Sequence, residues 1–104
     1  MMDKQFRNEN TDMLMRAVMS AGSIDECYDF FRDLCTESEI KIMSQRLHVA
    51  RMLKDSRMFS DIVRETEAGT ATINHVNSIL TNGTGGYTRA IERVESEHFG
   101  GDSI

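Results

Sequence analysis

Residues 58–80 have the sequence MFSDIVRETEAGTATINHVNSIL, and their pattern predicts two short helices joined by a tight turn. Ile62 and Val63 mark the inward face of the first helix. The inward face of the second is marked by three apolar residues at helical spacing, Ile73, Val76 and Leu80. The turn at residues 66–69 is short enough to make the helices cross steeply, as in a helix-turn-helix motif. We interpret the rest of the chain as the support for this pair.

The outward surface of the second helix carries small and hydrogen-bonding side chains and no carboxylate. Its residues are Thr70, Ala71, Thr72, Asn74, His75 and Ser78. A helix that enters the major groove of DNA needs such short polar groups, because they approach and read the base edges. The same residues are also ordinary choices at a helix start, so a plain helical corner remains the alternative.

The other segments predict four further helices, which makes the chain all-α with six helices. The chain contains no Pro, and capping boxes begin at Ser23 and Thr36. We expect a single helical domain over residues 1–104, with flexible tails at 1–4 and 99–104. The four further helices are expected at about residues 5–21, 24–35, 36–54 and 87–98.

The first predicted helix is apolar on two sides. Phe6, Leu14 and Val18 lie on one stripe, while Met15 and Met19 lie on the opposite side. A helix of this kind has two neighbours to pack against, and in a small chain the second is often another copy of the protein.

The charge distribution limits the class of partner. The net charge is −5, which opposes DNA binding, because Lys and Arg supply most of the affinity for phosphate. Basic residues nevertheless concentrate between Lys41 and Arg64, although the second helix of the pair has neither Lys nor Arg. No apolar run is long enough to span a bilayer and no signal peptide is recognisable, so we expect a cytoplasmic protein without a membrane partner.

Groups that support catalysis or metal binding are not clustered in the sequence. Cys27 and Cys35 are expected to be buried free thiols in one helix, and the three His residues are scattered. There is no nucleophile–base pair and no carboxylate pair at a plausible site. We therefore predict neither an enzyme nor a metal site.

Four segments together resemble the Trp repressor superfamily, and within it the YerC/YecD-type branch of related proteins. They are LCTESE at 34–39, Gln45-Arg46-Leu47, AGTATI at 68–73 and NGTGGY at 82–87. The resemblance implies a six-helix, intertwined homodimer that presents paired helix-turn-helix motifs to double-stranded DNA. It also implies that Thr70, Ala71, Thr72 and Asn74 read DNA, with His75 next to them.

The resemblance extends in part to the tryptophan pocket. Thr36 and Arg46 match pocket positions, whereas His75 replaces an Arg that stacks on the indole and Ile79 replaces a Ser that contacts the amino group. Because Ile cannot accept a hydrogen bond, tryptophan is not the expected effector. We expect no cofactor, and another small-molecule effector near Thr36, Arg46 and His75 remains open.

The turn departs from the family at Glu67, where relatives usually have Gly. If Glu67 is left-handed, its side chain costs about 1 kcal/mol, and Gly69 is expected to absorb some of the irregularity. The Glu67 carboxylate also lies beside the proposed DNA face.

Two functional hypotheses follow. The first is a sequence-specific DNA-binding transcriptional regulator, more specifically a repressor, that acts as a dimeric helix-turn-helix protein. The alternative is a helical protein-interaction module that keeps the fold and does not bind DNA. The negative net charge, the absence of Lys and Arg from the second helix and Glu67 all favour this alternative.

Overall fold

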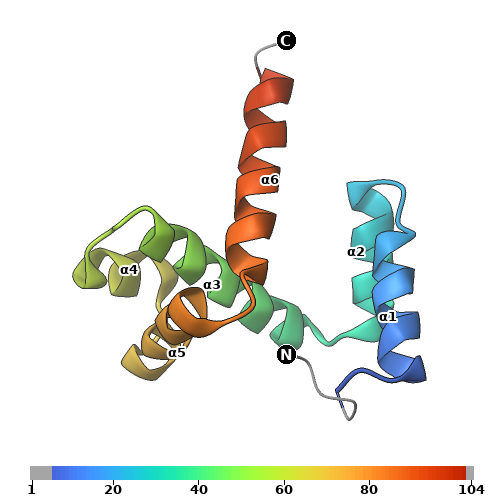
Figure 1. Cartoon of the computed structure of the whole chain (residues 1–104), viewed down its shortest axis with the longest axis horizontal. Coiled ribbons are helices and arrows are strands. Elements are labelled where there is room, and N and C mark those ends of the chain that lie inside the picture. The colour runs from blue at the N-terminus through green and yellow to red at the C-terminus, as the bar shows by residue number, and fades with distance from the viewer. Residues whose placement is uncertain (1–5, 103–104) are drawn as a thin grey trace. The chain divides into compact units, whose positions relative to one another are not determined.

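The computed structural model describes the backbone of residues 6–102 and the side chains of residues 6–97. Every regular secondary-structure element within this range is an α-helix, which confirms the predicted all-α class (Figure 1). The helices are α1 (Glu9–Met19), α2 (Ile24–Leu34), α3 (Glu37–Lys54), α4 (Phe59–Thr66), α5 (Thr70–Asn82) and α6 (Gly86–Asp102). None of them combines the length and apolarity needed to cross a membrane.

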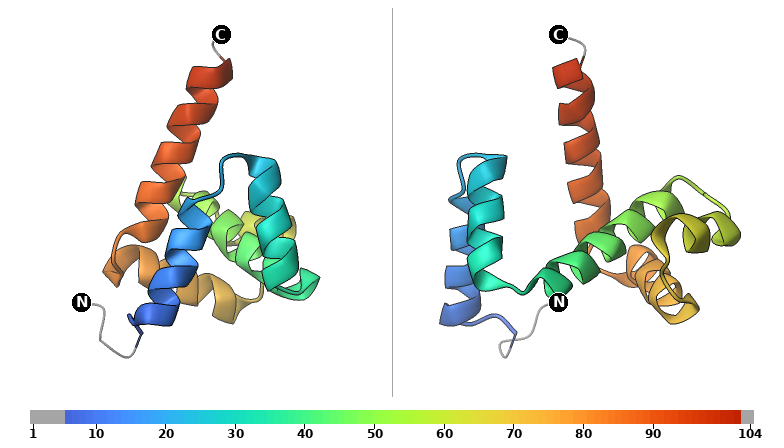
Figure 2. Two further views of the ribbon diagram at one scale, coloured as in Figure 1. Left: turned by 90° about the vertical axis from the view of Figure 1, so that its right-hand side faces the viewer. Right: turned by 180° about the vertical axis from the view of Figure 1, so that it is seen from behind.

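The chain divides into two compact units, one up to Lys41 and the other from Ile42. In the first unit α1 and α2 lie side by side and run in opposite directions (Figures 1 and 2). Neither helix contains a buried residue, and Met13, Met19 and Ile24 are 68%, 83% and 74% exposed. Because the described part of the first unit, residues 6–41, has no buried core of its own, a division into two independent domains does not follow, and the single domain stays a prediction.

The first helix begins later than the sequence predicted. Residues 6–8 are not helical, and α1 starts at Glu9 because Asn8 caps it. The Asn8 side chain accepts hydrogen bonds from the backbone N–H groups of Asn10 and Thr11, and the Thr11 hydroxyl accepts one from the Asn8 N–H. This reciprocal capping box fixes the start of the helix, and the predicted start at residue 5 is wrong.

Of the two predicted capping boxes, the one at Thr36 is complete and the one at Ser23 is only half formed. Ser23 accepts from the Glu26 N–H at 3.1 Å, although the Glu26 carboxylate bonds to the N–H of Gly22. Thr36 accepts from the Glu39 N–H at 3.1 Å, and the Glu39 carboxylate accepts from the Thr36 N–H at 2.8 Å. These contacts satisfy N–H groups that have no partner within the helices.

The second unit holds the hydrophobic core. Its buried residues come from α3, α4, the following turn, α5 and α6, namely Val49, Ala50, Met52, Ile62, Ala68, Ile73, Val76 and Ile91. Leu53, Leu80 and Tyr87 pack against this cluster. Val63, which the sequence pattern places on the inward face of α4, is 38% exposed, so that prediction is wrong. Only one side of this short helix therefore reaches the core.

The last helix is longer than predicted. It starts at Gly86 and continues to Asp102, so residues 99–102 are helical where the sequence had indicated a tail. Within the second unit its later part extends beyond the other helices (Figure 2). The remaining tail positions, 1–4 and 103–104, lie outside the described residues.

Candidate nucleic-acid interface

All of the residues predicted to read DNA lie in the first two turns of α5. Ile73 and Val76 are buried in the core of the second unit, which fixes the rotation of the helix about its axis. The predicted reading residues therefore face outward, with Thr70, Ala71, Asn74 and His75 exposed and Thr72 half-buried. The sequence pattern correctly separated the two faces of this helix.

Hydrogen bonds fix the turn between α4 and α5. The Thr66 hydroxyl donates to the Ile62 carbonyl at 2.7 Å and accepts from the Ala68 N–H at 3.1 Å. The Glu67 N–H donates to the Val63 carbonyl at 2.9 Å.

The turn is also held by a residue from α3. The Thr66 carbonyl accepts from the side-chain amide of Gln45 on α3 at 3.0 Å. The sequence pattern gives no sign of this role for Gln45, because a contact over 21 positions leaves no local signal.

The N-terminus of α5 is electrostatically suited to face an anion. Its cap residue, Gly69, makes no side-chain hydrogen bond, and the first turn contains no acidic residue. The N–H groups of the first turn have no partner within the helix, and the aligned peptide dipoles give this end a partial positive charge. A phosphate group at this end would therefore meet N–H donors without a competing carboxylate from α5 itself.

Glu67 adopts the left-handed conformation, with φ 60° and ψ 15°. The condition under which the sequence analysis assigns a steric cost to Glu67 is thus met. Gly69 has φ −77°, an ordinary value, so the expectation that it absorbs part of the irregularity is wrong. The strain of the turn lies on a residue with a Cβ atom, for which the left-handed region is disfavoured.

Replacing Glu67 by Gly is expected to stabilise the protein by about 1 kcal/mol, because Gly adopts a positive φ without the steric cost of Cβ. The measurement is the free energy of urea unfolding. Glu67→Gln is the matched control: it removes the charge but keeps the strain, and should leave stability nearly unchanged. Equal stabilisation by both variants would assign the effect to the carboxylate.

The second unit is much less acidic than the first. Residues 42–104 contain seven basic and eight acidic residues, whereas residues 1–41 contain five and nine. The cations on and just before α4 are locally paired, since Arg64 of α4 bonds to Asp61, and Arg57, which precedes the helix, bonds to Glu65. Among the described residues, Arg46, Arg89 and Arg93 form no ion pair. Three cations of the second unit are therefore available to a polyanion.

Comparison with known proteins identifies the family. The family model described as Trp repressor protein matches residues 9–95. The chain belongs to the Trp repressor protein family. It is 42% identical over 91 residues to the uncharacterized protein YerC of Bacillus subtilis strain 168, a match that covers 88% of each chain.

Two solved structures of Trp repressor relatives are similar to this chain. The crystal structure of a TrpR-like protein from Eubacterium eligens has a TM-score of 0.86 and 42% identity, and the match covers 89% of this chain and 96% of that one. A candidate Trp repressor from Staphylococcus aureus has a TM-score of 0.86 and 39% identity, with coverage of 91% and 95%. The six-helix fold predicted from the Trp repressor resemblance is thus confirmed.

The three residues predicted to form an effector pocket come from different segments of this chain. The Thr36 hydroxyl lies 3.2 Å from the Glu39 carboxylate and caps α3, so it already has local partners. Arg46 and His75 are both exposed in the second unit. The grouping of Thr36, Arg46 and His75 into one pocket stays a prediction.

The structure modifies one expectation about cysteines in this Trp repressor family member. Cys27 and Cys35 are free, but both are half-buried rather than buried, and Cys35 is the C-cap of α2 rather than a residue within it. In the described part of the chain, no three His, Cys, Asp or Glu side chains are grouped so that they would bind a metal ion.

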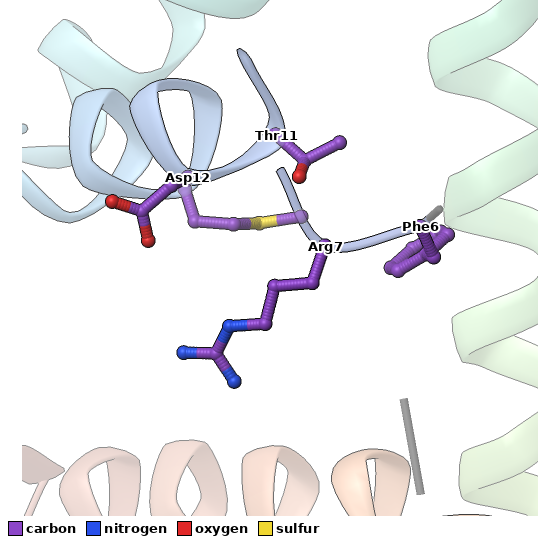
Figure 3. Close-up of a pocket in the computed structure, with 5 residues that line it drawn as sticks. Phe6, Arg7, Thr11 and Asp12 are labelled. Carbon is purple, nitrogen blue, oxygen red and sulfur yellow. The ribbon is translucent and has the colours of Figure 1, made fainter. Parts of the chain in front are cut away.

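A surface hollow of about 310 Å³ lies at the start of α1. It is lined by Phe6, Arg7, Thr11, Asp12 and Met15. Figure 3 shows the Arg7 side chain pointing away from Thr11, and Asp12 is paired with Arg16 at 2.8 Å. The hollow contains none of the residues predicted to contact DNA or an effector, and we assign it no role in this Trp repressor relative.

Proposed function

We propose that the chain is a cytoplasmic, homodimeric, sequence-specific DNA-binding transcriptional repressor in which α4 and α5 act as a helix-turn-helix motif. The observation that carries the proposal is the orientation of α5. Its apolar face is buried through Ile73 and Val76, and its short polar face is exposed. Membership of the Trp repressor protein family supports double-stranded DNA as the partner.

The homodimer is supported by the apolar surface that one chain leaves exposed. In the first unit, no residue of α1 or α2 is buried although both helices carry large apolar side chains. In the second unit, Leu47 and Val94 are 42% and 63% exposed and line a hollow of about 600 Å³ between α3 and α6. A second copy would cover these surfaces and space two α5 helices about one turn of DNA apart.

The alternative is a protein-interaction module that keeps the fold but does not bind DNA. It is favoured by the absence of Lys and Arg from α5 and by the pairing of Arg57 and Arg64 with carboxylates on α4. If the chain bound DNA, few cations would be left to neutralise the DNA phosphates, and this favours the alternative.

Selection of preferred sites from a random DNA pool tests the proposal. Enriched sites should be palindromic, because a symmetric dimer reads two equal half-sites. They should contain adenines in each half-site, since Asn pairs well with adenine and α5 lacks the Arg or Lys that most often reads guanine. Binding to a selected site should weaken as salt is raised. Absence of enrichment and of salt-dependent binding would favour the interaction module.

A small molecule that binds near Thr36, Arg46 and His75 is proposed as an effector that fixes the spacing of the two α5 helices. The support is the match of Thr36 and Arg46 to pocket positions of the family. A thermal-shift screen of amino acids and indoles tests this proposal, and no stabilisation by any compound would remove it.

A further inference from the structure

We propose that Gln45 is a positioning residue, which holds the start of α5 through the Thr66 carbonyl and thereby sets the orientation of the DNA-reading face. Its side-chain amide donates to that carbonyl at 3.0 Å. The inference rests on the proposed DNA-binding function, and neither the comparisons nor the sequence pattern assigns this role to Gln45.

The position of Thr66 explains why this contact matters. Thr66 is the last residue of α4, where backbone carbonyls have no partner within the helix. The next residue, Glu67, is left-handed, so the chain changes direction immediately after the bonded carbonyl. Gln45 therefore holds the peptide group at the point where the direction of α5 is decided.

The contact also connects two separate elements. Among residues 42–97, the other side-chain hydrogen bonds join positions no more than eight apart, whereas Gln45 and Thr66 are 21 apart. The Thr66 hydroxyl continues the chain of bonds to the Ala68 N–H, and Ala68 is only 3% exposed. A chain of hydrogen bonds thus runs from Gln45 on α3 through Thr66 to Ala68, which anchors the turn in the core.

The chemistry requires a donor at position 45. Gln45 is half-buried, and the carbonyl that it contacts can only accept a hydrogen bond. Met has a similar length but no donor, and an ionised Glu has only acceptors. Either replacement removes the bond to the Thr66 carbonyl while keeping a side chain of similar size.

The experiment compares Gln45→Met and Gln45→Glu with the wild-type chain, and uses Ser44→Ala as the matched control on an exposed neighbouring position of α3. Three quantities are measured: amide hydrogen exchange of Ala68, affinity for a selected DNA site, and the salt dependence of that affinity. Gln45→Met should accelerate Ala68 exchange and weaken DNA binding, each by about fivefold to tenfold. The salt dependence should not change, because no phosphate contact is removed. Ser44→Ala should stay within about twofold in all measurements.

The outcomes separate this inference from the proposed function. If the wild-type chain binds no DNA, the proposed function fails, and the positioning of the DNA-reading face by Gln45 fails with it. If the wild-type chain binds DNA but both Gln45 variants leave Ala68 exchange or DNA affinity unchanged, the positioning role alone is overturned. If Gln45→Met does not fold, the same two measurements on Gln45→Glu decide.

Discussion

Replacing Ala71 by Glu is expected to weaken DNA binding by about a hundredfold or more while leaving the protein folded. Ala71 is exposed in the first turn of α5, where the proposal places the DNA. A carboxylate there would face phosphates and base edges, and like charges brought together in an interface cost several kcal/mol. The measurement is the dissociation constant for a selected DNA site.

The same substitution should not reduce stability, and this separates its effect from unfolding. A negative charge in the first turn of a helix interacts favourably with the helix dipole. The thermal midpoint of Ala71→Glu should therefore equal or slightly exceed that of the wild type. Ser96→Glu, at an exposed position of α6, adds the same charge away from α5 and should bind DNA nearly as well as the wild type. Wild-type affinity of Ala71→Glu would show that α5 does not face DNA.

Replacing Ile73 by Ala is expected to lower the free energy of unfolding by about 2–5 kcal/mol, because the change leaves a cavity in a closely packed core. Ile73 is 1% exposed and belongs to the cluster that contains Ile62 and Val76. The measurement is urea unfolding at a fixed protein concentration, since the stability of the proposed homodimer would depend on concentration.

The matched control is Ile79→Ala on the same helix. Ile79 is 37% exposed, so removal of the same atoms should cost much less free energy than at Ile73. Similar losses at both positions would mean that Ile73 is not the residue that anchors α5 in the core.

Much of the fold was predictable because its signals are local. The spacing of Ile73 and Val76 predicts the buried face of α5, and the capping pairs at Ser23 and Thr36 predict where helices begin. The outward face of α5 follows directly once its buried face is known. For the same reason the predicted reading residues Thr70, Ala71, Asn74 and His75 are exposed in the structure.

The features that were missed depend on competing or distant contacts. Asn8 makes α1 begin later than predicted because its side chain captures two N–H groups, which periodicity alone does not register. Val63 follows the apolar pattern of α4, but this helix is short and the core of the described chain covers only its Ile62 side. The bond from Gln45 to Thr66 is formed by folding and has no counterpart in the spacing of neighbouring residues.

The near-balance of charge in the second unit has a consequence for the search of a genome. A repressor rich in cations spends much of its time bound to non-specific DNA sites, because its attraction to phosphate does not depend on the bases. Under the proposed function, this chain, with seven basic and eight acidic residues at positions 42–104, would be released quickly from such decoy sites. Few copies per cell would then suffice to occupy a correct operator, provided that base contacts supply the missing affinity.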